Sequence, residues 1–384
     1  MREFGKGRYR REVVANPAPL AGIPRRYKRY GIGTDDFIRR TTASGPYDIV
    51  LVTSLMTYWY PGVQKAIELL RDVLGDVPVL LGGIYATLCK DHAARHSGAD
   101  YIHAGPVERG ILFALSTFGF RPKRRKPSQT PGPVTRSSLS FAPLLTSRGC
   151  PFRCSYCASS LLHERFRRCD PASVLREIAW YNALGVTDFS FYDDALLVDA
   201  DDHIKPILRG VQVAGLRTRF HTPNGLHARY LDFELAGLMR KTGFRTIRLS
   251  LETVDAERLN RTGGKVRRED LEYAVENLRA WGFSKKEIGV YMMYGLPGQG
   301  LEEVREGVRF LEGLGVTIHL TEFSPIRGTR CWDDLVRSGI IPDDLDPLLT
   351  NNTIFSSLYS GYDPADIADL RLSVKQYNGA RIFR

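Results

Sequence analysis

Short apolar runs alternate with longer segments of helical periodicity over most of the chain. A short apolar run is typical of a strand that is buried on both faces. Strands that alternate with helices favour parallel β–α–β units over an antiparallel sheet. The pattern therefore predicts an α/β protein built from parallel sheets.

Three strand–helix repeats are expected near the N-terminus. The strands are predicted at residues 47–54, 77–83 and 100–105, and the helices at 64–74, 84–96 and 107–117. We therefore expect a small Rossmann-like parallel α/β domain over residues 45–118. Residues 1–44 contain several prolines and no clear periodicity, and they are expected to form an irregular N-terminal arm with room for one short helix.

Six further strand–helix repeats are expected after residue 141. The strands are predicted at 143–147, 188–192, 218–222, 246–251, 287–294 and 317–323, and the helices at 171–184, 200–214, 232–242, 268–281 and 301–314. Six units are too few to close an eight-stranded barrel. Residues 141–330 are therefore expected to form a partial (β/α)6 TIM-like barrel, between a basic, proline-rich linker over 119–140 and a C-terminal helical tail over 331–384.

Three of the six cysteines lie within eight residues, as Cys150, Cys154 and Cys157. Thiolates are soft ligands that suit iron–sulfur clusters and zinc. Structural zinc needs a fourth ligand, and the nearest further cysteine, Cys169, is twelve residues on. The spacing favours a cubane with one open iron over a zinc knuckle or free thiols.

This cysteine loop resembles the signature of radical S-adenosylmethionine (SAM) enzymes, and the six-unit core predicted around it matches that family's fold. The resemblance implies a 4Fe–4S cluster on Cys150, Cys154 and Cys157, with SAM chelating the fourth iron and Tyr156 beside the adenine. One electron, from a donor such as flavodoxin or ferredoxin, would cleave SAM to methionine and a 5′-deoxyadenosyl radical. A second cluster is not expected.

The resemblance also assigns SAM contacts to the ends of later strands. Asp193 and Asp194 would meet the amino group, Ser250 and Glu252 the ribose or amino acid portion, and Gly295 and Gly298 the adenine. An N-cap for a following turn is the alternative for the aspartates, and a buried or capping carboxylate is the alternative for Glu252. Arg327 is assigned to substrate. General-base roles are weighed against simple packing for His221, His227, Tyr291 and Tyr294.

The N-terminal domain resembles the cobalamin-binding domain that precedes many radical SAM enzymes. Ser54, Gly82 and Gly83 match the positions that flank the nucleotide tail of cobalamin. The Asp-x-His-x-x-Gly motif that supplies a lower cobalt ligand is absent. Bound cobalamin would imply methyl transfer to an unactivated carbon or a phosphinate, with one SAM recharging the cobalt and a second generating the radical. The alternative is a domain that only packs on the barrel or shapes a substrate pocket.

Composition adds the compartment and the expected partners. Lysine and arginine number 54 against 43 acidic residues, and two basic stretches at 25–29 and 121–126 carry much of the excess. These stretches favour solvated surface over a nucleic-acid site, because no RNA-binding module accompanies them. No apolar run is long enough to span a bilayer, and clustered cysteines favour a reducing compartment. A cytoplasmic enzyme is expected.

The sequence therefore predicts a cobalamin-dependent radical SAM methyltransferase that acts on an unactivated carbon of a small molecule or natural product. One alternative is a cobalamin-free radical SAM enzyme that performs rearrangement, cyclisation or another hydrogen abstraction. A second is a non-catalytic iron–sulfur or zinc protein that serves as a redox sensor or scaffold. RNA modification is a third, and salt-sensitive RNA binding would favour it.

Overall fold

The computed structural model describes residues 9–108, 110–121 and 139–379. Most of the predicted linker over 119–140, and with it most of the second basic stretch, lies outside the described residues. The described residues form two compact units. The barrel unit comprises 139–323 and 356–379, and the N-terminal unit comprises 9–108, 110–121 and 324–355.

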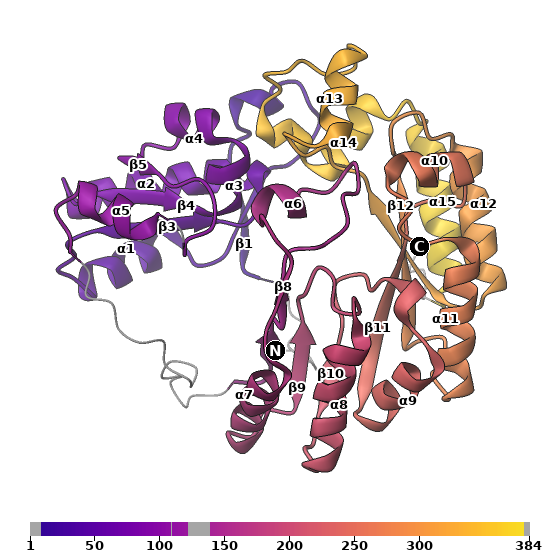
Figure 1. The fold of residues 1–384 in the computed structure, drawn as a ribbon. Coiled ribbons are helices and arrows are strands. Elements are labelled where there is room, and N and C mark those ends of the chain that lie inside the picture. Colours follow the sequence, from indigo (N-terminus) through magenta and orange to yellow (C-terminus); the bar gives the residue numbers. More distant parts are fainter. Residues whose placement is uncertain (1–8, 109, 122–138, 380–384) are drawn as a thin grey trace. The chain divides into compact units, whose positions relative to one another are not determined.

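The barrel unit is built on a six-stranded sheet in the order β13-β12-β11-β10-β9-β6, with every neighbouring pair parallel. Figure 1 shows helices lining the outside of this sheet. The predicted partial barrel is confirmed. The strands are β6 (Ala142–Leu144), β9 (Asp188–Phe191), β10 (Arg219–His221), β11 (Phe244–Leu251), β12 (Ile288–Tyr294) and β13 (Thr317–Glu322). The outer helices are α7 (Pro171–Ala183), α8 (Ile204–Val213), α9 (Phe233–Lys241), α11 (Arg268–Ala280), α12 (Leu301–Gly313) and α15 (Pro364–Tyr377).

The core of the barrel unit lies between the sheet and these helices. Outward-facing strand residues such as Phe189, Phe220, Leu249 and Val290 are fully buried against helix residues. Side chains alternate along each strand, so the residues between them face the inside of the barrel. This arrangement leaves the inner face and the strand ends available for chemistry.

The C-terminal helix covers the edge strand of the sheet. Both side-chain groups of Asn378, just after α15, pair with the backbone of Ile318 in β13 at 3.0 Å and 2.8 Å. An unpaired edge would otherwise present free backbone groups to other chains. The helix predicted over 200–214 is divided into η4 (Ala200–Asp202) and α8. Smaller elements of the barrel unit were not predicted: β7 (Ser147–Arg148), β8 (Arg167–Arg168), α6 (Ser159–Leu162), η5 (Ala228–Tyr230) and α10 (Ala256–Thr262).

The N-terminal unit holds the three predicted parallel strands, in the order β3-β4-β5. The predicted Rossmann-like domain is thus confirmed as a fold. Its sheet elements are β3 (Val50–Ser54), β4 (Val79–Gly82) and β5 (Tyr101–Ile102), and its helices are α1 (Thr34–Ala43), α2 (Tyr60–Leu74), α3 (Gly83–Leu88), α4 (Lys90–His96) and α5 (Ile111–Thr117). The short 3-10 helices are η2 (Ala18–Leu20) and η3 (Thr57–Trp59).

Two features of this unit differ from the sequence predictions. The single helix predicted over 84–96 is divided at Cys89, whose dihedral angles leave the helical region while its side chain stays buried in the core. No glycine or proline marks that break, so the sequence pattern did not reveal it. Within the predicted irregular arm, β1 (Arg11–Val13) and β2 (Lys28–Tyr30) form an antiparallel pair.

A segment from beyond the barrel completes the N-terminal unit. It includes α13 (Arg330–Arg337), η6 (Pro347–Thr350) and the start of α14 (Asn352–Tyr359). Leu348 and Ile354 belong to the same buried cluster as Tyr60 and Tyr85. The Tyr60 hydroxyl also donates to the Asp346 carboxylate over 3.0 Å. No helix among the described residues is both long and apolar enough to cross a bilayer.

Candidate functional site

The three-cysteine loop is held by a small hairpin at the end of β6. Ser147–Arg148 pairs antiparallel with Arg167–Arg168 and so closes the two ends of the loop. At Gly149 a Cβ atom would meet Cβ of His163 at 3.0 Å and the carbonyl of Arg165 at 3.1 Å. Glycine therefore lets the two sides of the loop approach closely just before Cys150.

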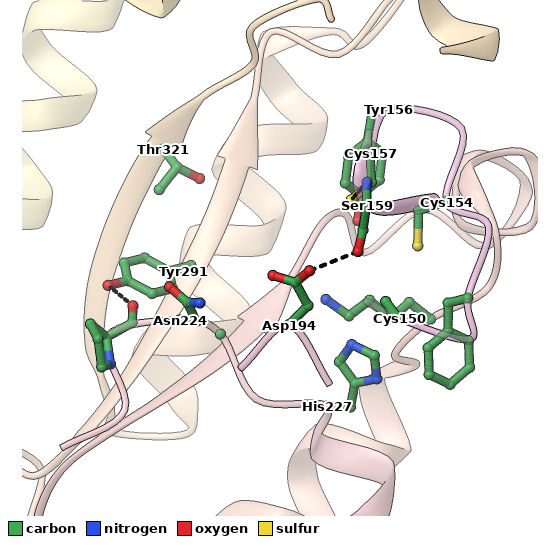
Figure 2. Close-up of a pocket in the computed structure, with 14 residues that line it drawn as sticks. Cys150, Cys154, Tyr156, Cys157, Ser159, Asp194, Asn224, His227, Tyr291 and Thr321 are labelled. Carbon is green, nitrogen blue, oxygen red and sulfur yellow. Dashed lines mark hydrogen bonds between the residues drawn. The ribbon is translucent and has the colours of Figure 1, made fainter. Parts of the chain in front are cut away.

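All three cysteines line one cavity of about 390 Å³ (Figure 2). The remaining lining residues come from the cysteine loop and from the segments at or after the carboxyl ends of the strands. Active sites of barrel folds lie at this edge. Lining residues besides the cysteines are Phe152, Tyr156, Ser159, Asp194, Pro223, Asn224, Gly225, His227, Lys265, Tyr291 and Thr321.

The three cysteines fit a cluster better than a single metal ion. All are free thiols, and burial raises the pKa of each, to about 11 for Cys154. A bound cation reverses this effect, because it deprotonates a coordinating thiol outright. No group of three His, Cys, Asp or Glu side chains in the described parts of the chain converges on a single ion. A cubane binds each thiolate to a different iron, so its three cysteines do not need to converge on one ion.

Tyr156 and Glu252 meet beside the cysteines. The Tyr156 hydroxyl donates to Oε1 of Glu252 over 2.7 Å, and burial together with this carboxylate raises the pKa of Tyr156 well above its usual range. Glu252 is only 4% exposed, and its Oε2 has no hydrogen-bond partner among the described residues. An orphaned carboxylate oxygen beside the cavity fits an absent cationic or hydrogen-bond-donating group, such as the amino or ribose group of SAM.

Lys265 also belongs to this cluster, and sequence reasoning missed it. Its Nζ lies 3.6 Å from Oε1 of Glu252, and its side chain lines the cavity. The available signal was the Gly263-Gly264-Lys265 run after the Glu252 strand end, where two glycines precede a cation.

The two predicted aspartates diverge in the structure. Asp194 lines the cavity and accepts a 2.7 Å hydrogen bond from Ser159. Asp193 does not line it: the side chain is 3% exposed and accepts from Thr146 at 2.8 Å and Ser147 at 2.6 Å. Burial raises the pKa of Asp193. Asp193 therefore anchors the base of the cysteine loop.

Ser250 and the predicted adenine glycines lie outside the lining of the cavity. Ser250 is 9% exposed and lies under Gly225, where a Cβ atom would come within 2.9 Å of the Ser250 Cβ. Gly295 and Gly298 form the turn after β12. Their contacts with SAM stay predictions.

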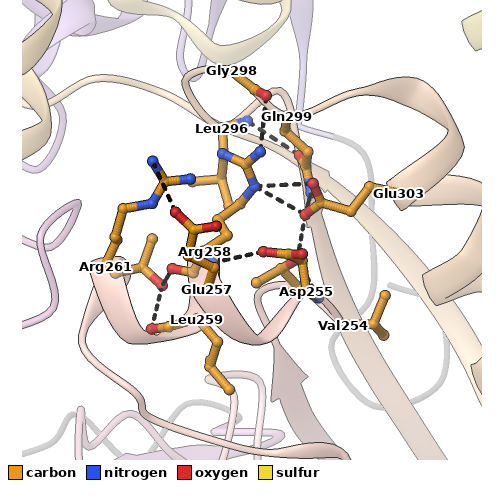
Figure 3. A network of polar contacts seen from close by, with 12 residues as sticks. Val254, Asp255, Glu257, Arg258, Leu259, Arg261, Leu296, Gly298, Gln299 and Glu303 are labelled. Atoms are coloured by element: carbon orange, nitrogen blue, oxygen red, sulfur yellow. Dashed lines mark hydrogen bonds and ion pairs between the residues drawn. The ribbon is translucent and has the colours of Figure 1, made fainter.

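The turn after β12 is fixed by Arg258 of α10 (Figure 3). The Arg258 guanidinium donates to the carbonyls of Pro297 at 2.7 Å and Gly298 at 2.8 Å. Its Nε also lies 3.0 Å from both carboxylate oxygens of Glu303. Glu303 in turn accepts from Thr253, just after β11. These contacts fix the turn relative to the Glu252 strand end.

The other end of α10 contacts the cysteine loop. The Ser155 N–H donates to the Thr262 carbonyl over 3.1 Å, and a Cβ at Gly263 would meet Cα of Cys154 at 3.1 Å. One short helix thus connects the cysteine loop to the glycine turn. The sequence analysis did not predict this helix.

Of the four side chains considered as general bases, His227 and Tyr291 line the cavity. Burial lowers the pKa of His227 to about 2, so its imidazole is neutral at physiological pH. His221 instead bonds Thr246 at 2.9 Å, and Tyr294 donates to Glu322 at 2.7 Å. These last two have structural contacts away from the cavity.

In the N-terminal unit, Ser54, Gly82 and Gly83 lie together where β3 and β4 end. Ser54 bridges to Gly83, and its hydroxyl donates to the Met56 carbonyl over 3.0 Å. Gly83 has a φ of +88°, and a Cβ there would lie 2.7 Å from the Ser54 carbonyl, so only glycine allows this close approach. A Cβ at Gly82 would meet a single atom within 4 Å, at 3.9 Å, which leaves room above the strand end.

Large apolar side chains surround this carboxyl edge. Leu55, Met56 and Trp59 follow β3 and are 65%, 41% and 52% exposed, and Val107 follows β5 at 55%. Ligands of open parallel sheets bind at this edge. Open strand ends with exposed apolar neighbours fit a large cofactor with an apolar ring, such as cobalamin.

Arg327 contacts its own segment of the N-terminal unit. It donates to the Asp343 carbonyl, and its guanidinium carbon lies 4.6 Å from the centre of the Trp332 ring. These contacts account for the side chain without a substrate. The predicted substrate role of Arg327 is untested.

Comparisons with known proteins agree with this geometry. The model of the radical SAM superfamily matches residues 144–311, and the model of the B12 binding domain matches residues 13–111. The first model covers the cysteine loop and most of the barrel. The second covers β3, β4 and β5.

Two relatives with similar sequences are methyltransferases by name. An uncharacterised methyltransferase of Pyrococcus horikoshii is 22% identical over 334 residues, which are 77% of this chain and 70% of the relative. Cytidylyl-2-hydroxyethylphosphonate methyltransferase of Streptomyces wedmorensis is 24% identical over 246 residues, 62% of this chain and 46% of the relative. This chain therefore spans less than half of the Streptomyces protein.

The radical SAM methyltransferase TsrM of Kitasatospora setae has a similar fold. Its structure with tryptophan and a SAM analogue matches with a TM-score of 0.65 at 20% identity, over 78% of this chain and 67% of TsrM. The chain is therefore a radical SAM enzyme, with a radical SAM domain over residues 144–311 and a B12-binding domain ahead of it over residues 13–111.

Proposed function

We propose that this enzyme is a cobalamin-dependent radical SAM methyltransferase that acts on an unactivated carbon of a small molecule. The observation that carries the proposal is the cavity in which Cys150, Cys154 and Cys157 meet Tyr156 and Asp194 at the carboxyl edge of the barrel. The B12-binding domain adds the second cofactor. The relatives named above are methyltransferases by name, which supports methyl transfer over the other radical reactions.

The residues have distinct tasks in this proposal. When bound, the cluster supplies the electron that cleaves SAM, and cobalamin carries the methyl group. Cys150, Cys154 and Cys157 hold the cluster. Asp194 and Glu252 accept from the amino and ribose groups of SAM, because Asp194 lines the cavity and Glu252 contacts the lining residues Tyr156 and Lys265.

Other residues position SAM and limit the access of water. Lys265 supplies a positive charge that attracts the SAM carboxylate, and it remains within reach of Glu252. The Arg258 contacts hold the glycine turn that is proposed to meet the adenine. The rings of Phe152 and His227, with centroids 4.7 Å apart, close one side of the cavity against water.

The domains, partners and compartment follow from the same proposal. Cobalamin is placed in residues 45–118 and SAM in residues 141–330, with the arm, linker and tail outside both. A flavodoxin or ferredoxin is the proposed electron donor, and nucleic acid is not a proposed partner. A cytoplasmic location agrees with the reduced cysteines that the cluster requires.

Cofactor content and SAM turnover test the proposal together. Protein made without oxygen in cobalamin-supplied cells should contain about four irons and one cobalt per chain. With a strong reductant and SAM it should form 5′-deoxyadenosine and S-adenosylhomocysteine. Cys154→Ala should lose iron and 5′-deoxyadenosine, whereas Cys169→Ala should keep both, because Cys169 does not line the cavity.

Each remaining outcome selects another function. Iron and 5′-deoxyadenosine without cobalt, despite ample cobalamin, would point to the cobalamin-free radical SAM enzyme. Zinc in place of iron, or a cluster without any SAM cleavage, would point to a sensor or scaffold.

A further inference from the structure

The inner face of the barrel carries a layer of polar side chains below the cavity. Arg248 of β11 pairs in register with Gly289 of β12, and Ser250 pairs with Tyr291. Residues two apart on a strand share a face. Because Tyr291 lines the cavity, Arg248 and Gly289 lie on the same inner face, one pleat below it.

Gly289 makes room for two charged or polar groups. A Cβ at Gly289 would come within 2.7 Å of Nη1 of Arg248 and 2.8 Å of Nε2 of His319. The guanidinium and the imidazole therefore both lie over Gly289 and are neighbours. The Tyr291 hydroxyl donates to the Pro223 carbonyl over 2.8 Å and lies close enough to Arg248 to affect the pKa of the guanidinium, so Tyr291 connects the layer to the cavity above.

Arg248 has no acidic partner in the described parts of the chain. The guanidinium donates to the Ile247 carbonyl at 3.2 Å, and no carboxylate of the described residues lies within 4.0 Å of it. Burial lowers the pKa of Arg248, yet a guanidinium stays protonated in proteins. By contrast, Arg219 of β10, in the same sheet, has an acidic partner: it donates to the Asp188 carboxylate over 2.8 Å.

A half-buried cation without a carboxylate is costly unless an anion joins it. Arg248 is only partly buried, so solutes can reach it. Guanidinium groups bind carboxylates and phosphates through two parallel hydrogen bonds. A histidine N–H beside the guanidinium can add one more donor. The chain's net charge of +11 also favours the approach of anions.

We infer that Arg248, with His319, binds an oxyanion of the methyl acceptor. The acceptor is thus an anionic small molecule that carries a carboxylate, a phosphate or a phosphonate. With the anion at Arg248, the rest of the molecule extends past Tyr291 into the cavity that the cysteines line. The identity of the anion as part of a methyl acceptor rests on the proposed function, whereas anion binding is measured without turnover.

Calorimetric titration of the full-length, anaerobically prepared protein tests this inference. Inorganic phosphate, methylphosphonate and acetate are the probes, and uncharged trimethyl phosphate is the neutral control. Wild type should bind at least one anion and not the neutral compound. Arg248→Met should weaken that binding at least tenfold. Arg245→Met removes the same charge from an exposed position on the same strand and should bind as wild type does.

The probe that binds most tightly identifies the acidic group of the substrate. The inference would be overturned if the wild type bound none of the three anions. It would also be overturned if Arg248→Met bound them as tightly as the wild type does. If Arg248→Met does not fold, Arg248→Lys serves instead: it keeps the charge but loses the planar fork, so binding should weaken several-fold, and unchanged binding overturns the inference. Anion binding in a protein that holds no cobalt would reject cobalamin-dependent transfer but leave the anion site intact.

Discussion

The Tyr156 hydroxyl donates a 2.7 Å hydrogen bond to Oε1 of Glu252, 96 residues away in the sequence. This bond joins the cysteine loop to the end of β11. Glu252 keeps its second oxygen without a described partner, and Lys265 lies 3.6 Å from the first. The carboxylate is therefore held in position for a further donor.

Removing the charge of Glu252 should weaken SAM binding. Glu252→Gln keeps the shape of the side chain but replaces one acceptor oxygen with a donor NH2 group. It also removes the negative charge beside Lys265. We expect the dissociation constant of SAM, measured by equilibrium dialysis, to rise about tenfold or more, because hydrogen bonds to charged groups are the stronger kind. The exposed Glu257→Gln on α10 is the control. Equal affinities in all three proteins would contradict a SAM role for Glu252.

Loss of Arg258 should destabilise the barrel unit. Arg258→Met would leave the mostly buried Glu303 carboxylate without its cation and two carbonyls without their donor. Breaking such a pair costs about 3 kcal/mol or more, which urea unfolding followed by circular dichroism can measure. The exposed Arg261→Met on the same helix should change stability by about 0.5 kcal/mol or less. Similar effects from both variants would show that the Arg258 network contributes little.

Alanine variants of two neighbouring glycines allow the effect of backbone strain to be measured separately from the effect of contact with the cysteine loop. Gly263 and Gly264 both have positive φ, so alanine at either should cost about 1 kcal/mol of stability. A Cβ at Gly263 would meet Cα of Cys154 at 3.1 Å, whereas one at Gly264 has no atom within 4 Å. Only Gly263→Ala should therefore lower the iron content of the reconstituted protein. Equal iron in the two variants would show that the cysteine loop tolerates displacement by α10.

Because of His203, the free energy of unfolding should decrease as the pH falls below about 6.5. His203 is 1% exposed, and burial, followed by the charge of Arg168, lowers its pKa to about 4 from the ordinary 6.5. Between these values the unfolded state binds the extra proton, so stability decreases as the pH falls from about 6.5 towards 4, by up to about 1.4 kcal/mol per pH unit.

The variant His203→Gln tests this dependence. Gln cannot take up a proton, and its side chain can replace the 2.9 Å contact that Nε2 makes with Thr146. We expect the variant to lose less stability than wild type between pH 6.5 and pH 5, measured by urea unfolding. At pH 8 both side chains are neutral, so the difference there gives the pH-independent cost of the substitution. Parallel curves would refute the prediction.

The sequence predicted the sheets and the cysteine site because both depend on local patterns. Buried parallel strands show as apolar runs, and the cysteine spacing is a local signal of its chemistry. Long-range relationships were not predicted. Neither the burial of Asp193 under the cysteine loop nor the approach of Lys265 to Glu252 has a local signal, because each depends on how separate strand ends meet. In the sequence, Arg248 is simply one polar residue of a predicted strand. Only the fold shows that no carboxylate of the described residues lies beside it.

The position of residues 324–355 has a consequence for folding during synthesis. The core of the N-terminal unit needs Leu348 and Ile354, and Tyr60 needs the Asp346 carboxylate. A ribosome makes all six strands of the barrel sheet before it makes these residues. The N-terminal unit therefore cannot finish its core until residues 346–354 have emerged, and a truncation before Asp346 should leave that core incomplete even though every residue of its sheet is present.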